Sequence, residues 1–141
     1  MSNWFVDTNI LIDLISDRKP FSIAAISVFK MAEDGKIGLF TSSHSLATCH
    51  YLLKKYTDEK TLREILLRLM DYLTVISVDE NILKSGLRSI HKDFEDSIQI
   101  FCAATIPDME GIITRNIKDF KDSHIPALTP DDVCKLLFPG Q

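Results

Sequence analysis

The stretch that decides the fold runs from Asn3 to Asp13 and reads NWFVDTNILID. Its apolar run, Trp4 to Val6, stops at Asp7, and a segment with helical spacing of apolar residues begins at once with Thr8. This pattern predicts a strand that passes into a helix through a minimal turn, with a carboxylate at the carboxyl end of the strand. In open α/β sheets, ligands bind in the crevice beyond those strand ends. The Asp7 carboxylate is therefore either a binding group or a cap for the first N–H groups of the helix.

Outward from this stretch, short apolar runs alternate with helical patterns along the whole chain. Further strands are predicted at residues 37–40, 73–78, 111–114 and 125–128. Helices are predicted at about residues 22–33, 43–56 and 79–91, from the acidic turn 93–96 to residue 106, and from residues 8, 58 and 130 onward. This alternation predicts an α/β fold: a single three-layer α/β/α domain, residues 1–141, with a mostly parallel sheet of four to five strands. The strand at 125–128 is expected at an edge, because Pro126 cannot donate to a strand ladder.

Composition is that of an ordinary globular protein. An apolar fraction of 45% and a charged fraction of 26% over 141 residues are sufficient for one domain with a hydrophobic core. No apolar run approaches the ~18 residues of a membrane span, and a strand that begins by Trp4 leaves no room for a signal peptide. The three cysteines lack metal-type spacing and lie in apolar helical contexts, which favours reduced thiols in a cytoplasmic protein.

Several classes of enzyme are disfavoured by what the sequence lacks. No glycine-rich phosphate loop is present, and no Ser-His-Asp or Cys-His arrangement has supporting context. The triplet from Asp7 to Asn9 resembles the Asp-x-Asp start of haloacid-dehalogenase phosphatases, but those need an acid where Asn9 stands. The net charge of −4 argues against a protein that holds nucleic acid by bulk electrostatics. It does not exclude a nuclease, because a site that binds metal must be acidic.

Acidic and amide side chains follow the predicted strands or open the predicted helices. Asp7 ends the first strand, Asp96 lies where the helix before the fourth strand begins, and Asn116 and Asp119 follow that fourth strand. Because the carboxyl ends of parallel strands meet at one edge of a sheet, these groups can converge on one crevice. Oxygen ligands of this kind suit Mg²⁺ or Mn²⁺ rather than zinc or copper. Such an ion activates water and stabilises the departing oxygen of a phosphodiester.

Three segments carry a resemblance to a known family: VDTNIL at 6–11, FEDSIQ at 94–99 and IITRNIKDF at 112–120. In this order and at these separations they resemble the three main motifs of PIN-domain proteins, over almost the whole chain. That family comprises metal-dependent ribonucleases, many of them the toxins of prokaryotic VapBC-type toxin–antitoxin pairs. The resemblance implies a PIN-like fold, an endoribonuclease that hydrolyses RNA with Mg²⁺ or Mn²⁺ as cofactor, and a small antitoxin protein as partner.

The resemblance also implies roles for individual residues. Asp7 and Asp96 would be the metal ligands, and Asn116 and Asp119 would complete the catalytic set. The residues that would orient the carboxylates through hydrogen bonds are Thr8, Asn9 and Thr114. The candidates for contacts with RNA phosphates at the rim of the crevice are Arg115 and Lys118, with Lys121 beside them. For these basic residues a solvated surface is an equally good explanation.

One position departs from the family pattern. PIN-domain proteins usually carry a Glu on the helix after the second strand, which here is residues 43–56. That segment contains no Asp or Glu, and Thr48 or its neighbour Cys49 stands in the expected place. A carboxylate has been lost, so fewer negative charges remain to hold a divalent ion. This loss keeps a second hypothesis open: a catalytically degenerate PIN-like domain that binds RNA or a protein partner without cutting.

Other side chains are poor replacements for that Glu. The side chains of His44, His50 and Cys49 are softer ligands that suit Mg²⁺ badly. Asp13 and Glu95 are more easily explained as solvated helix residues. The apolar stripe formed by Leu62, Ile65, Leu66 and Leu69 is either core or a dimer face, and we expect the protein to form a homodimer.

Overall fold

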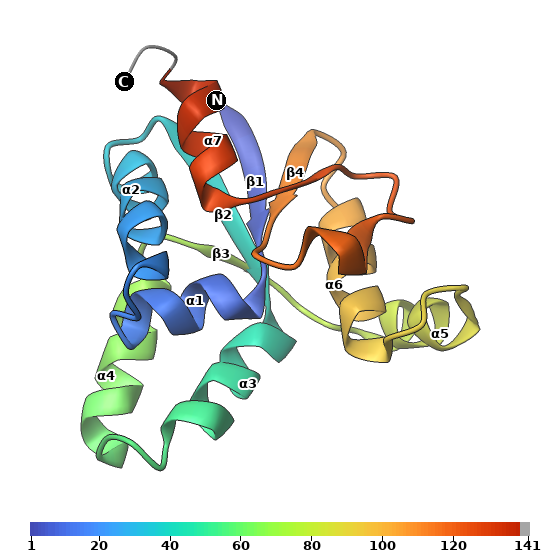
Figure 1. Cartoon of the computed structure of the whole chain (residues 1–141). Helices are drawn as coiled ribbons and strands as arrows, with labels where there is room; N and C mark the ends of the chain where they lie inside the picture. Colours follow the sequence, from blue (N-terminus) through green and yellow to red (C-terminus); the bar gives the residue numbers. More distant parts are fainter. Residues whose placement is uncertain (139–141) are drawn as a thin grey trace.

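A parallel five-stranded sheet forms the centre of the protein in the computed structural model, which describes residues 1–138 (Figure 1). The order of strands is β3-β2-β1-β4-β5, and every neighbouring pair is parallel. The bounds are β1 Ser2–Val6, β2 Ile37–Ser42, β3 Thr74–Ile76, β4 Met109–Ile113 and β5 Ala127–Leu128. The sheet confirms the predicted α/β fold, and β5 is the predicted edge strand. Because β1 is central, Asp7 stands at the middle of the carboxyl edge.

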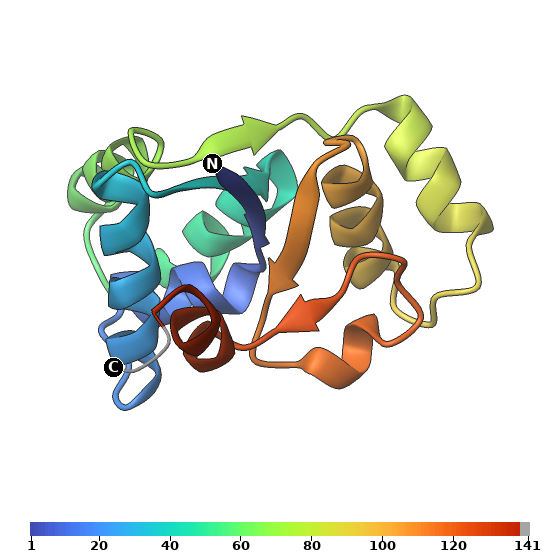
Figure 2. The same cartoon turned by 90° about the horizontal axis from the view of Figure 1, so that it is seen from above.

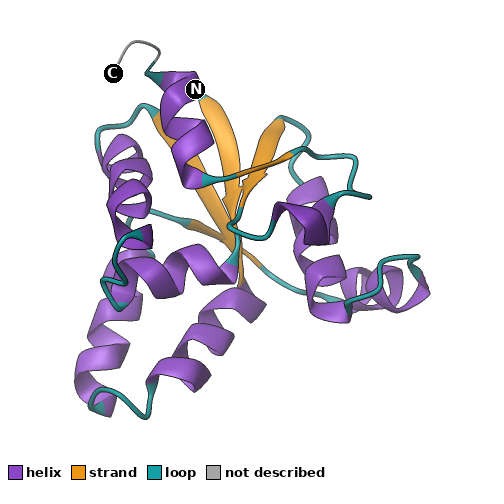
Figure 3. Cartoon of the chain, in the orientation of Figure 1, coloured by secondary structure: helices purple, strands orange, loops and turns teal. Residues whose placement is uncertain are grey.

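Helices cover both faces of the sheet, as the three layers in Figure 3 show. The bounds of the helices, including the short 3₁₀ helix η1, are α1 Thr8–Ile15, α2 Phe21–Glu33, α3 Ser43–Leu53, α4 Glu59–Leu69, α5 Glu80–Arg88, α6 Phe94–Ala104, η1 Ile117–Phe120 and α7 Pro130–Leu137. None of the helices among residues 1–138 is both long and apolar enough to span a membrane. Seen from above, α2 and α7 lie on one side of the sheet and α5 and α6 on the other (Figure 2).

Side chains along β1 point alternately to the two faces of the sheet, and the core is accordingly divided into two clusters. Trp4 and Val6 point to the face that packs against α1, α2, α4 and α7, whereas Phe5 points to the face covered by α5, α6 and η1. This is the period of two that a strand buried on both faces requires. Leu62 and Leu69 of the α4 stripe are buried, and Leu66 packs against the first cluster. The stripe is therefore core.

Some helix and strand ends differ from the prediction. Strand β3 is limited to Thr74–Ile76, because it pairs only with the last residues of β2. Helix α3 ends at Leu53, and the chain turns until the Asp58 side chain accepts from the N–H of Thr61 and caps α4. Gly35 has φ 73° after α2, the left-handed conformation that glycine adopts readily at the end of a helix.

Strand register brings distant segments together at the carboxyl edge. Val6 pairs with Ile113, and the backbone N–H of Asp7 donates to the Ile113 carbonyl at 3.0 Å. Strand β2 ends at Ser42, whose side chain accepts from the Ser45 N–H at 3.0 Å and starts α3. Helices α1 and α3 consequently leave the same end of the sheet (Figure 1).

Candidate active site

The Asp7 carboxylate lies at this edge and is buried, with 7% of the residue exposed. Its Oδ1 accepts from the Thr8 backbone N–H at 2.9 Å and from Gln99 Nε2 at 3.1 Å. Its Oδ2 accepts from Thr114 Oγ1 at 2.9 Å and from Asn9 Nδ2 at 3.2 Å. A carboxylate offers about four acceptor positions, so protein donors engage all of them. Asp7 therefore caps α1 and is also fixed from β4 and α6.

The pKa of Asp7 is raised, chiefly because burial disfavours the charged form. The hydrogen bonds from Gln99, Thr114 and Thr8 act in the opposite direction, and the nearby charge of Asp119 adds to the rise. The same donors that hold the carboxylate in place therefore also support its ionised form.

Gln99 connects Asp7 to the start of α3. This side chain, from α6, is 2% exposed. Its Oε1 accepts from Ser42 Oγ at 2.6 Å, and its Nε2 lies 2.6 Å from Ser45 Oγ. Thr8 Oγ1 closes the network with a bond of 2.9 Å to Ser45 Oγ. Three segments far apart in the chain are thus joined around one carboxylate.

Sequence reasoning did not single out Gln99, Ser42 or Ser45. The available signal was an amide at position 99 between Ile98 and Ile100, in a helix with apolar residues on both sides of it. A buried amide needs hydrogen-bond partners, and Ser42 and Ser45 at the start of α3, on the same sheet edge, supply them.

A cleft opens beside Asp7, and α1, α3 and α6 form its walls. It is lined by Asp7, Thr8, Asn9, Ile12, His44, Thr48, Leu52, Glu95, Asp96, Gln99 and Asn116. The predicted ligands Asp7 and Asp96 thus face the same space, with Asn116 on its wall. Asp96 is partly buried, and its pKa is raised to about 7 by burial first and then by the charges of Asp93, Asp7, Asp119 and Glu95. The cleft therefore concentrates negative charge on one side.

The remaining predicted residues lie around this cleft. Asn116 donates its backbone N–H to Thr114 Oγ1 at 3.0 Å. Asp119 is exposed on η1 and does not line the cleft, but it raises the pKa of both Asp7 and Asp96. Lys118 is exposed on the same turn.

Arg115 is bound to α1 rather than extended into solvent. Its Nε lies 2.6 Å from Asp13 Oδ2, its Nη2 lies 3.3 Å from Asp13 Oδ1, and its guanidinium carbon lies 4.2 Å from the Phe21 ring centroid. The interpretation of Asp13 as a solvated helix residue was wrong, since it is 0% exposed. Burial of its charge is compensated by the two-pronged contact with Arg115.

Helix α3 presents Thr48 to the cleft. Burial, and secondarily the charge of Asp7, raises the pKa of Cys49 to about 12, so its thiol stays protonated. His44 reaches across the cleft, with Nε2 at 3.4 Å from Glu95 Oε1. His50 does not line the cleft and instead pairs with Glu59. Within residues 1–138 there is no group of three or more His, Cys, Asp or Glu side chains placed to hold an ion.

Comparison with known proteins identifies relatives of this arrangement. The family model described as "PIN domain" matches residues 3–118. Ribonuclease VapC1 of Aquifex aeolicus is 26% identical over 138 residues, which cover 93% of this chain and 92% of that protein. A toxin–antitoxin complex from Klebsiella pneumoniae contains a chain that is 29% identical, with a TM-score of 0.59, over 89% of this chain and 96% of that one. VapBC2 from Rickettsia felis, bound to a promoter DNA fragment, shares the fold at 16% identity and a TM-score of 0.66, over 90% and 98% of the chains.

Proposed function

The chain belongs to the PIN-domain family, and we propose that it is a metal-dependent endoribonuclease, the toxin of a toxin–antitoxin pair. The observation that carries the proposal is the Asp7 carboxylate, buried at the end of the central strand and facing the same cleft as Asp96. The similarity to ribonuclease VapC1 over 93% of the chain supports RNA as the substrate.

The donor atoms in the cleft fit a hard divalent cation. The carboxylates of Asp7 and Asp96 and the amide oxygen of Asn116 are oxygen ligands, the class that Mg²⁺ and Mn²⁺ take. When bound by these residues, the ion would activate water for attack on phosphorus and offset charge on the departing oxygen. Two carboxylates supply little ligand charge, and an ion at Asp7 must displace a donor such as the Asn9 amide at 3.2 Å. Binding is therefore expected to be weak.

Residues of the site hold the Asp7 carboxylate in place and set the pH at which Asp96 loses its proton. The bonds from Thr8, Gln99 and Thr114 leave Asp7 one orientation toward the cleft. Asp96 binds and releases a proton near neutral pH, because its pKa is about 7. A cation must compete with that proton, so loading of the site should improve as the pH rises through 7.

A second candidate function is an RNA- or protein-binding domain without cleavage. It is favoured by one observation, the absence of three grouped acidic, His or Cys ligands among the described residues. We further propose a small antitoxin protein as partner, since relatives of this chain include a toxin–antitoxin complex; the homodimer stays a prediction from the family resemblance alone. Co-expression with the product of a neighbouring small reading frame, followed by light scattering, tests both.

The deciding experiment is cleavage of labelled RNA with Mg²⁺, with Mn²⁺ and with EDTA. We expect metal-dependent cleavage by the wild type and loss of most activity in Asp7→Asn and Asp96→Asn, which keep side-chain size but remove charge. Asp71→Asn, in an exposed turn after α4, is the matched control and should cleave like the wild type. Equal cleavage by all four proteins would place the chemistry elsewhere. No cleavage by the wild type, with RNA bound, would favour the binding domain.

A further inference from the structure

Helix α3 extends from the acidic part of the cleft to a basic and aromatic end. His44, Thr48 and Leu52 all line the cleft, and residues four apart lie on the same face of a helix. The wall of the cleft therefore follows one face of α3 down to its last turn. The residues that follow on and next to this face, through the turn into α4, are 51–56.

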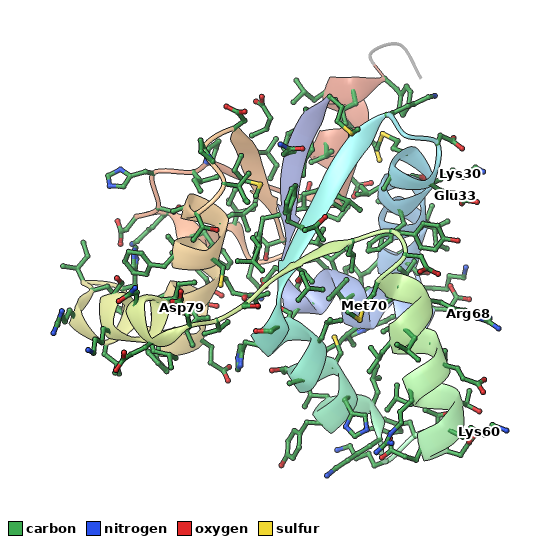
Figure 4. All side chains as sticks on the ribbon, turned by 180° about the vertical axis from the view of Figure 1, so that it is seen from behind. Lys30, Glu33, Lys60, Arg68, Met70 and Asp79 are labelled. Carbon is green, nitrogen blue, oxygen red and sulfur yellow. The ribbon has the colours of Figure 1, made fainter. Side chains whose placement is uncertain are left out.

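This wall differs in charge from the opposite one. Residues 35–57 contain no Asp or Glu, the longest such run in a chain of net charge −4, and they include Lys54 and Lys55. Asp96 and Glu95 stand across the cleft. Lys60 adds a cation in the first turn of α4, next to the turn that follows α3 (Figure 4). The cleft thus has an acidic wall suited to a cation and a basic extension suited to phosphate.

Two tyrosines are exposed on this extension. Tyr51 is 66% exposed and Tyr56 is 76% exposed. The Lys54 ammonium lies 5.0 Å from the Tyr51 ring centroid, and the Lys55 ammonium lies 5.3 Å from that of Tyr56. Within residues 1–138 neither lysine forms an ion pair with a carboxylate. The rings and their cations are therefore available to a ligand.

We propose that residues 51–56 bind single-stranded RNA and lead it along α3 into the cleft. Bases would stack on Tyr51 and Tyr56, and the adjacent lysines would contact the phosphates between them. Stacking uses the π-face that every base has, so this segment supplies affinity without strict sequence preference. The inference rests on the proposed function, and it assigns the path of the substrate outside the catalytic residues.

Charge complementarity favours RNA over a second copy of this chain as the occupant. A two-fold interface centred on this segment would place its lysines against the same lysines of the partner. Like charges facing each other oppose such an interface, whereas a phosphate backbone complements them. The acidic opposite wall also repels phosphate, so the strand is directed to the α3 side.

The test measures binding of a fluorescein-labelled oligouridylate in the Asp7→Asn protein, which prevents cleavage. Loss of one stacked base weakens binding by about 5- to 150-fold, and we expect this range for Tyr51→Ala and for Tyr56→Ala. Tyr51→Phe keeps the ring and should leave Kd unchanged. Replacing Lys54 and Lys55 with Gln should reduce the slope of log Kd against log salt concentration by the amount that two phosphate contacts contribute.

Tyr72→Ala is the matched control, because Tyr72 is an exposed tyrosine of the turn after α4 and does not line the cleft. It should bind RNA like its parent, and all variants should keep the parent's circular dichroism and thermal melting. Unchanged affinity in both alanine variants, or no RNA binding by the parent, overturns the inference. A change of oligomeric state with unchanged RNA affinity would instead make the segment an interface between copies.

Cleavage by the wild type, measured separately, distinguishes the two proposals. If the wild type cleaves RNA and the tyrosine variants show the wild-type KM, the proposed function stands and the proposal that residues 51–56 bind RNA is wrong. If the wild type cleaves nothing while Tyr51→Ala weakens binding, the segment stands and the catalytic proposal is wrong.

Discussion

Replacing Asp96 with Asn removes a carboxyl whose pKa is raised from 3.8 to about 7, so the variant should be more stable than the wild type at pH 8. Well below the unfolded pKa of 3.8 the group is protonated in both the folded and the unfolded wild type, and its ionisation does not affect stability. Between pH 4 and 7 the folded state holds the proton more tightly than the unfolded state, so wild-type stability falls as the pH rises. Well above pH 7 the carboxyl is ionised in both states, so the destabilisation has its full value and no longer changes with pH.

The magnitude follows from the shift and the surroundings of the carboxyl group. Raising the pKa of Asp96 from 3.8 to about 7 sets a ceiling of ~4 kcal/mol on the destabilisation. Asp96 is only partly buried, so solvent screens much of this energy. It also lies in the first turn of α6, where the helix dipole favours a negative charge by ~0.3–1 kcal/mol. We expect ~1–2 kcal/mol at pH 8, or a Tm higher by ~3–8 °C.

Differential scanning calorimetry from pH 4 to pH 9 in EDTA measures this, with Asp71→Asn as the control for loss of an exposed acid. Adding Mn²⁺ at pH 8 should raise the Tm of the wild type more than that of Asp96→Asn, because the ion needs the carboxylate. An Asn variant that is no more stable at pH 8, or whose advantage is the same at pH 4, would refute the reasoning.

Three further substitutions test other contacts of the site. Thr48→Glu should destabilise the metal-free protein at pH 8 and tighten Mn²⁺ binding in thermal-shift titrations; weaker Mn²⁺ binding would show that another ligand completes the site. Gln99→Leu should lower the free energy of unfolding in urea by ~1–3 kcal/mol, because hydroxyl and carboxylate groups lose a buried partner; an unchanged midpoint would contradict the network. Arg115→Ala should destabilise by ~3–5 kcal/mol by leaving Asp13 buried and unpaired, whereas Lys118→Ala, at an exposed position, should have no effect on the same measurement.

The parts of the fold that the sequence predicted are those decided by local patterns. The junction at Asp7 was predicted because the apolar run of a strand and the start of a helix are adjacent in the chain. The edge position of β5 follows from Pro126, which has no N–H to donate to a strand ladder. The end of α2 follows from Gly35, since glycine adopts a positive φ without strain. The position of Asp7 and Asp96 in one cleft required only that parallel strands end at a common edge.

The contacts that could not be predicted join positions about a hundred residues apart. Gln99 lies 92 residues from Asp7, and position 99 looks like an interior helix residue in a local window. Asp13 lies 102 residues from Arg115, so its pattern was that of a surface acid on a helix. Burial of a polar residue depends on its partner, and no periodicity within one segment shows that partner. Sequence reasoning therefore located the sheet edge that carries the candidate site but not the hydrogen-bond network that supports it.

The absence of Asp and Glu from α3 and the four donors on Asp7 belong to one electrostatic arrangement. A carboxylate at position 48 would face the cleft with Asp7 and Asp96, whose pKa values are already raised without it. Thr48 adds no such repulsion, and the neutral Gln99 side chain holds Asp7 by a hydrogen bond. In the proposed metal site Thr48 supplies no ligand charge, and it also leaves residues 35–57 free of negative charge. On the proposed function, weaker metal binding and easier approach of RNA along α3 therefore have a common cause.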